Sequence, residues 1–145
     1  MLSVSHIKII AIGKIKRKWI QEGIEMYLKR LPGLNVIEIK DSTLTKEEYA
    51  LKGLLKKNES LITLDEKGQS FTSQEFSQKL LNFQNQKIVF AIGGANGFSP
   101  TLNRSASWKL SLSPLTFPHE IARLLFIEQI YRAKMITQDS PYHKE

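Results

Sequence analysis

Two loops of this 145-residue chain have compositions that suit the binding of a small ligand. The first, residues 93–97, reads GGANG and is called the glycine loop. Glycines let a backbone approach a ligand closely and leave N–H groups free to donate. The spacing is neither the G-x-G-x-x-G of dinucleotide-binding folds nor a Walker loop, because no Gly-Lys-Ser/Thr follows. A simple tight turn is the alternative interpretation, since glycine is the commonest turn residue.

The second loop, residues 113–118, is called the proline loop because Pro114 and Pro118 stiffen it. It carries Leu115 and Phe117 at positions where polar turn residues are usual. A rigid apolar loop that offers backbone donors and acceptors suits a flat, uncharged heterocycle such as adenine. A connection that only packs into the core fits the same residues, because buried loops must also satisfy their backbone groups.

The titratable residues do not indicate a metal site. His6, His119 and His143 share no metal-ligand spacing, and the chain has no cysteine. Thiolate nucleophiles, disulfides and cysteine zinc sites are therefore excluded, and we expect no bound metal. His6 falls in an apolar run and is expected to be structural, and His143 lies in a terminal tail, where a solvated end is the simplest interpretation.

The net charge of +7 favours an anionic partner, with nucleic acid as the first candidate. Lys16, Arg17 and Lys18 cluster in one segment and form either a solvated face or a phosphate-contacting surface. No signature of a known nucleic-acid-binding module is present. No apolar run approaches the ~20 residues of a membrane helix, and the N-terminal residues make a poor signal peptide. We therefore expect a cytoplasmic protein that does not enter membranes.

Short apolar runs alternate with amphipathic segments along the chain, which is typical of an α/β domain. Thr45 with Glu48, and Thr72 with Glu75, have the spacing of a capping box at a helix start. The first helix is expected to bury one continuous face made of Trp19, Ile20, Gly23, Ile24, Tyr27, Leu28 and Leu31. The next two helices are expected to bury Leu51, Leu54 and Leu55, and then Phe76, Leu80 and Phe83. A long helix is expected from residue 119 to about residue 138, with Pro118 in its first turn.

The strands are expected over residues 6–12, 34–39, 60–64, 87–92 and 108–112, with a turn at 65–68. These elements predict one α/β domain over residues 1–145, with a mostly parallel sheet of five or six strands and helices on both faces. Ligands of such sheets bind beyond the carboxyl ends of the strands. Leu64 with Asp65, the glycine loop and the proline loop all leave such ends, so we expect the two loops to emerge side by side.

Four ordered segments of the chain resemble the RlmH family of bacterial methyltransferases, which belong to the SPOUT class. They are residues 92–97 (IGGANG), 112–119 (LSPLTFPH), 128–133 (EQIYRA) and 141–145 (PYHKE). The likeness extends over the whole chain and includes residues 9–14 (IIAIGK) and 63–65 (TLD). The resemblance implies an α/β fold with a C-terminal trefoil knot, which general rules of chain topology treat as nearly absent. It also implies a homodimer that uses S-adenosylmethionine.

The resemblance places the cofactor contacts at the three strand ends. They are Leu64, Gly93, Leu112, Ser113, Pro114, Leu115, Thr116 and Phe117. The implied reaction is methylation of N3 of a pseudouridine in the large-subunit (23S-type) rRNA, on the assembled ribosome. The neighbouring subunit's tail is expected near the cofactor.

For this reaction His143 is a candidate general base, because an imidazole titrates near neutral pH. A positive charge from Arg132 or Lys144 that stabilises the anionic ring is the alternative. Tyr142 would stack on the target base or hydrogen-bond to it. The expected RNA contacts are Lys16, Arg17, Lys18 and Lys144. Apart from the resemblance, the residues also fit a non-catalytic ribosome- or RNA-binding protein, or a small nucleotide-binding protein.

Overall fold

A computed structural model describes residues 2–144 and shows an α/β fold built on one five-stranded sheet. All strand pairs are parallel, and the strand order is β2-β1-β4-β3-β5. The elements in chain order are β1 (Ile7–Ile12), α1 (Lys18–Lys29), β2 (Asn35–Ile39), α2 (Leu44–Leu54), β3 (Glu59–Ser70), α3 (Ser73–Asn82), β4 (Lys87–Ile92), α4 (Pro100–Ser105), β5 (Trp108–Ser111) and α5 (His119–Thr137).

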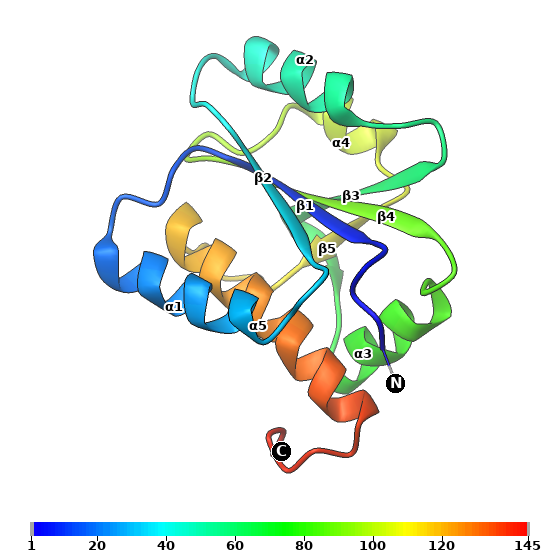
Figure 1. Ribbon diagram of the computed structural model, residues 1–145. Coiled ribbons are helices and arrows are strands. Elements are labelled where there is room, and N and C mark those ends of the chain that lie inside the picture. Colours follow the sequence, from blue (N-terminus) through cyan, green and yellow to red (C-terminus); the bar gives the residue numbers. More distant parts are fainter. Residues whose placement is uncertain (1, 145) are drawn as a thin grey trace.

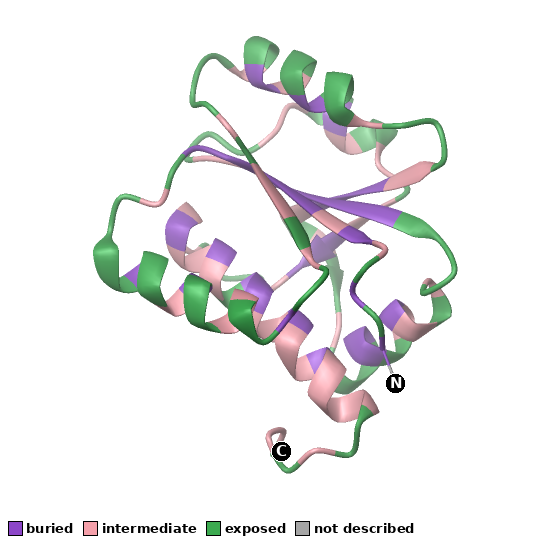
Figure 2. Ribbon diagram, in the orientation of Figure 1, coloured by how far each residue is buried: buried purple, intermediate pink, exposed green. Residues whose placement is uncertain are grey.

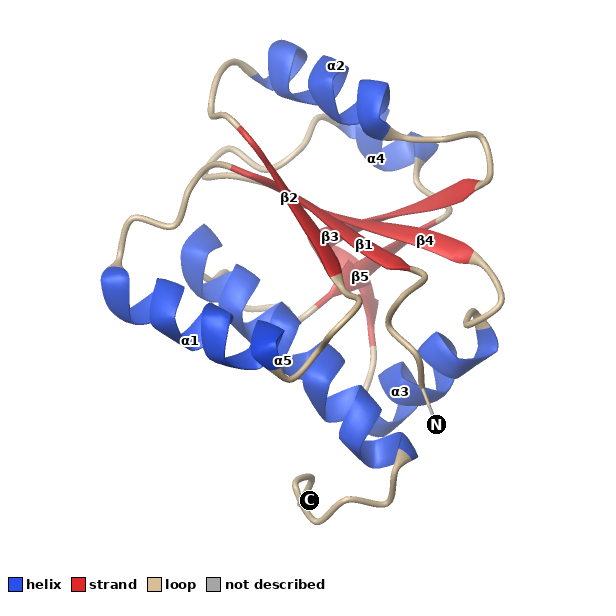
Figure 3. Ribbon diagram, viewed as in Figure 1, coloured by secondary structure: helices blue, strands red, loops and turns tan. Residues whose placement is uncertain are grey.

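Helices cover both faces of the sheet, as predicted (Figures 1 and 3). Helices α2 and α4 lie on one face, and α1, α3 and α5 lie on the other. Successive side chains of a strand point to opposite faces, so Ile9 joins the core under α1 and α5 whereas Ile10 joins the core under α2. The central strands β1 and β4 are therefore buried on both sides (Figure 2). Within residues 2–144, no helix is both long and apolar enough to cross a membrane.

The strand predictions are mostly confirmed, and β4 has the bounds that its apolar run indicates. The predicted turn at 65–68 is wrong, because β3 continues to Ser70 with a register shift against β5 between Leu64 and Gln69. Gly68 explains why the chain stays beside β5. A Cβ there would lie 2.7 Å from the backbone carbon and oxygen of Lys109, so only glycine permits this close approach. The implied trefoil knot and the single-domain organisation stay predictions.

The helix starts show which local signals were correct. The capping box of Thr72 and Glu75 is confirmed at the start of α3. The box predicted at Thr45 and Glu48 is wrong, because α2 begins two residues earlier and Thr43 caps it by accepting from the backbone N–H of Lys46. Glu48 instead accepts from the backbone N–H and the hydroxyl of Ser99, both at 2.7 Å, and so links α2 to the start of α4.

Two apolar side chains that the helical patterns placed in the core are exposed. Trp19 is 60% exposed at the edge of the α1 face that buries Ile20 and Ile24, and Leu54 is 37% exposed at the end of α2. Helix α4 was not among the predicted helices, although Ser99 and Pro100 have the residue types of an N-cap and a first helical position. Pro118 is the N-cap of α5 instead of a residue of its first turn.

The buried Arg123 fastens α5 to the carboxyl end of β1. Its side chain is 3% exposed, and its Nη2 donates to the carbonyl oxygens of Ile12 (3.0 Å) and Gly13 (2.9 Å). Its Nη1 donates to Glu38 of β2 at 2.6 Å. The guanidinium therefore satisfies carbonyl groups that lie where the strand ends, and it fixes the start of α5 relative to the sheet.

We predict that Arg123→Ala lowers the free energy of unfolding by about 3 kcal/mol, because it leaves buried carbonyl groups without a donor. Urea denaturation measures this loss as a shift of the midpoint at constant m. The matched control is Glu38→Gln, which keeps those carbonyl contacts. Glu38 is 43% exposed and a glutamine there can still accept from Arg123 Nη1, so this change should cost clearly less than Arg123→Ala. Equal losses in the two variants would contradict this account of Arg123.

Candidate functional site

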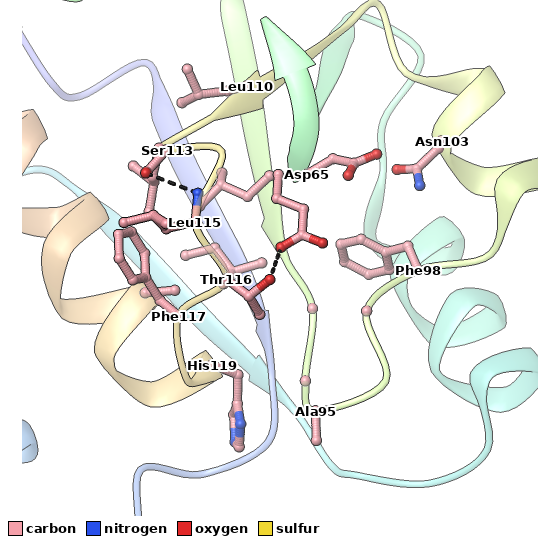
Figure 4. Close-up of a pocket in the computed structure, with 18 residues that line it drawn as sticks. Asp65, Ala95, Phe98, Asn103, Leu110, Ser113, Leu115, Thr116, Phe117 and His119 are labelled. Atoms are coloured by element: carbon pink, nitrogen blue, oxygen red, sulfur yellow. Dashed lines mark hydrogen bonds between the residues drawn. The ribbon is translucent and has the colours of Figure 1, made fainter. Parts of the chain in front are cut away.

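A cavity of about 350 Å³ opens where β4 and β5 end beside the middle of β3 (Figure 4). The three strands are neighbours in the sheet, so residues 64–66 of β3 lie next to the loops that leave β4 and β5. The lining residues come from β3, the glycine loop, the proline loop and the starts of α4 and α5. The cavity is lined by Leu64, Asp65, Glu66, Ile92, Gly93, Gly94, Ala95, Gly97, Phe98, Asn103, Leu110, Leu112, Ser113, Leu115, Thr116, Phe117, His119 and Ala122.

The two loops emerge side by side, as expected, and the space between them is open. Every residue predicted to contact the cofactor lines this cavity except Pro114. Pro114 belongs to the proline loop, but its neighbours Ser113 and Leu115 form that part of the wall. The structure therefore brings the three strand-end segments into one cavity.

The glycine loop is both a tight turn and a wall of the cavity. The backbone N–H of Gly97 donates to the carbonyl of Gly94 at 3.1 Å, and Gly97 has φ of +63°, which favours glycine. A Cβ on Gly93 would lie only 3.0–3.1 Å from the backbone of Gly97. The loop can fold back on itself at the end of β4 because Gly93 has no side chain that would meet the backbone of Gly97.

The proline loop is held in place by two hydrogen bonds. The backbone N–H of Leu115 donates to Ser113 Oγ at 3.1 Å, and Thr116 Oγ1 donates to the carboxylate of Glu66 (Figure 4). Glu66 belongs to β3, so the second bond joins two walls of the cavity. The loop exposes Leu115 (70% exposed) at its tip.

The cavity also has an unpaired hydrogen-bond acceptor that the sequence did not single out. Asn103 Oδ1, on α4, is buried and has no partner among the described residues. An unpaired buried carbonyl group is costly, so a ligand N–H that reaches it would be stabilised. The sequence analysis missed Glu66 because it did not predict that β3 extends past Leu64. It missed Asn103 because it did not predict α4.

The predicted catalytic residues Arg132, Tyr142 and His143 come together, but at the other end of α5. Arg132 Nη1 donates to His143 Nδ1 at 3.1 Å, and its guanidinium lies 4.9 Å from the centre of the Tyr142 ring. Arg132 follows His119 by thirteen positions on one helix, which corresponds to about 20 Å. Within one chain these side chains are therefore remote from the cavity that His119 lines.

The contact between Arg132 and His143 constrains the histidine. A guanidinium can only donate, so His143 Nδ1 must accept and carries no proton in this arrangement. A neutral imidazole then has its proton on Nε2. The lone pair of Nδ1 is therefore occupied while this contact lasts.

The predicted RNA-binding residues lie in two places. Lys16, Arg17 and Lys18 are exposed between β1 and α1, and Lys144 is exposed in the tail. The loop between β1 and α1 is anchored by the buried Glu120 of α5, which accepts from the backbone N–H groups of Lys16 and Arg17, both at 3.1 Å. Burial alone would raise the pKa of Glu120, but these backbone hydrogen bonds outweigh it and the pKa is lowered. Glu120 is therefore ionised at neutral pH and holds the basic segment beside the start of α5.

Comparison with known proteins identifies the family. Residues 5–143 match the family described as "Predicted SPOUT methyltransferase". The chain belongs to the SPOUT methyltransferase family. It is 72% identical over 145 residues to "Ribosomal RNA large subunit methyltransferase H" of Prochlorococcus marinus (strain NATL2A), with all of both chains covered. It is 49% identical over 143 residues to the protein of the same name from Synechococcus sp. (strain CC9605), with 99% of each chain covered.

A SPOUT methyltransferase needs a methyl donor, and the cavity is the part of the structure suited to hold one. Its volume is within the usual range for small-molecule sites, and its walls combine apolar side chains with a few polar groups. Among residues 2–144, no group of three or more histidine, aspartate or glutamate side chains is arranged to hold a metal ion.

We predict that Gly93→Ala weakens the binding of S-adenosylhomocysteine by about tenfold or more, because the new Cβ must push the backbone of Gly97 and distort the cavity wall. Isothermal titration measures the affinity. Gly53→Ala on α2 is the matched control, since a Cβ there meets nothing within 4 Å. The same affinity in both variants would show that the glycine loop does not shape the binding site.

Proposed function

We propose that this SPOUT methyltransferase transfers a methyl group from S-adenosylmethionine to N3 of a pseudouridine in the large-subunit rRNA, on the assembled ribosome. The observation that carries the proposal is the cavity between β3 and the ends of β4 and β5, bounded by both loops. The printed names of the relatives support the large-subunit rRNA as substrate. The resemblance of the four sequence segments to the RlmH family supports the pseudouridine and its N3 atom.

The cavity residues fit an adenosyl group. Leu112, Leu115 and Phe117 offer apolar surface for a flat heterocycle, and Asn103 Oδ1 can accept from an exocyclic amine. Gly93 lets the backbone approach the ligand closely. S-adenosylmethionine, when bound, supplies an activated methyl group, so the protein's main contribution is to position it against the target base.

The tail residues Arg132, Tyr142 and His143 are the proposed partners of the target base. N3 must lose its proton before or during attack, and a base must lie within about 3 Å of it or act through one water. His143 can act in this way only after its contact with Arg132 opens, because Nδ1 already accepts from the guanidinium. While the contact lasts, the three side chains hold the tail in place and are available to orient the ring.

We propose a homodimer in which the tail of one chain completes the cavity of the other. About 20 Å of α5 separates the cavity from Arg132, so Arg132 cannot reach the cavity of its own chain. This separation supports the proposal. Two copies with antiparallel α5 helices would place the tail of each beside the start of the other's α5. Leu115 lines the cavity, and Leu125 of α5 lines a second, smaller cavity between α5 and the start of α3. Both side chains are exposed, so they offer apolar surface that a second copy would cover.

The experiment that tests the function combines binding and transfer. We expect saturable binding of S-adenosylhomocysteine by isothermal titration, and transfer of one labelled methyl group per ribosome when the ribosomes lack this modification. Mass spectrometry of the digested rRNA should place the label on a pseudouridine. A preference for a nucleoside triphosphate would favour a nucleotide-binding protein, and ribosome binding without transfer would favour a non-catalytic one.

A second prediction concerns the basic segment between β1 and α1. Changing Lys16, Arg17 and Lys18 to Glu should weaken ribosome binding, because their contacts with phosphate release counterions. The slope of log affinity against log salt should become shallower by about 2. The control changes three exposed lysines of the α2 region, Lys46, Lys52 and Lys57, to Glu, which alters the net charge equally. Equal losses in both variants would mean that only overall charge matters.

A further inference from the structure

The carboxylate of Glu128 lies at the centre of the polar contacts that join the tail to α5. Its side chain is 14% exposed. Glu128 Oε2 accepts from Arg132 Nη2 at 2.8 Å and from the Tyr142 hydroxyl at 2.7 Å. Glu128 Oε1 accepts from Arg132 Nε at 3.3 Å and from Gln129 Nε2 at 3.1 Å. One carboxylate thus receives donors from its own helix and from the tail.

The charges around this carboxylate reinforce one another. The hydrogen bond from Arg132 to Glu128 is the largest cause of the raised pKa of Arg132. The pKa of Tyr142 is also raised, first by burial and then by its hydrogen bonds to Tyr27 and Glu128. The phenol is therefore protonated at neutral pH and donates to the carboxylate, which is a strong, charge-assisted hydrogen bond.

All three nitrogens of the Arg132 guanidinium already donate a hydrogen bond, and one N–H on each of Nη1 and Nη2 is left over. Nε and Nη2 donate to Glu128, and Nη1 donates to His143. Because Glu128 neutralises the charge of Arg132, the pair is poorly suited to stabilise an anionic ring. The pair is well suited to fix the imidazole, since the bidentate contact sets the direction of Nη1.

Aromatic contacts complete the arrangement. The Tyr142 ring packs edge-on against Tyr131 of α5, with ring centres 4.9 Å apart, and its hydroxyl lies 3.3 Å from that of Tyr27 on α1. Chain ends usually fray, so these contacts must outweigh the entropy of the last residues. A tail already ordered before RNA binds avoids that cost during binding.

We propose that Glu128 is a positioning residue for methyl transfer, which acts through Arg132 and Tyr142 to keep the tail ordered before RNA arrives. This inference rests on the proposed function, because it assumes that the tail meets the target base. Glu128 does not line the cavity of its own chain, and its link to the tail passes through Arg132 and Tyr142.

The test is Glu128→Gln, which keeps the shape of the side chain and removes its charge. Amide hydrogen exchange of residues 140–144 in the free protein should accelerate by about tenfold or more, since charge-assisted bonds are lost. The pKa of Tyr142, followed by NMR, should fall towards that of an exposed tyrosine. Single-turnover methylation should slow by about tenfold or more, whereas the affinity for S-adenosylhomocysteine should change less than about twofold.

Glu25→Gln on α1 is the matched control, because it removes the same charge from an exposed position and should change none of these quantities. Tyr142→Phe removes only the phenol contact and should accelerate tail exchange to a smaller degree. Unchanged tail exchange in Glu128→Gln, whatever the methylation rate, would overturn the positioning role. Exchange and the Tyr142 pKa are measured without cofactor or ribosome, so failure of the proposed function would appear separately, as absent methylation by the unchanged protein.

Discussion

Parallel pairing of β3 with both β4 and β5 is the constraint on which the candidate site depends. Thr63 pairs with Ala91 of β4, and Leu64 pairs with Leu110 of β5, so β4 and β5 end beside the middle of β3. The glycine loop and the proline loop leave these ends and enclose one cavity. The cavity therefore follows from the order of strands in the sheet, and the loops supply its shape and chemistry.

Helix α5 connects this cavity with the other functional elements. Its first turns carry Glu120, which anchors the basic segment, and Arg123, which fastens the helix to β1. Its later turns carry Glu128 and Arg132, which hold the tail. A helix of this length is rigid, so it keeps the cavity and the tail apart in one chain. In the proposed dimer, the tail of one chain would instead complete the cavity of the other.

Local signals predicted much of the fold. The apolar run of β4 and the capping box of Thr72 and Glu75 depend only on neighbouring residues, and both are confirmed. The predictions were wrong where two neighbouring residues fit the same local pattern. Thr43 and Thr45 can both cap a helix; the structure uses Thr43, and Glu48 binds Ser99, which is distant in sequence. Trp19 fits the helical period of α1 but lies at the margin of the face that packs on α5.

Periodicity, turn residues and motif spacing were sufficient to indicate an α/β fold and the two loops that border the cavity. The resemblance to the RlmH family supplied the individual contact residues, and all of them except Pro114 line the cavity. Such sequence patterns are local properties, so they could not show that Glu66 reaches Thr116 fifty positions away, or that Glu120 binds the backbone near residue 16. They also could not show that Arg132, Tyr142 and His143 gather around Glu128 at the far end of α5. Those contacts exist only after the sheet and helices have packed, because packing brings distant segments within hydrogen-bond distance.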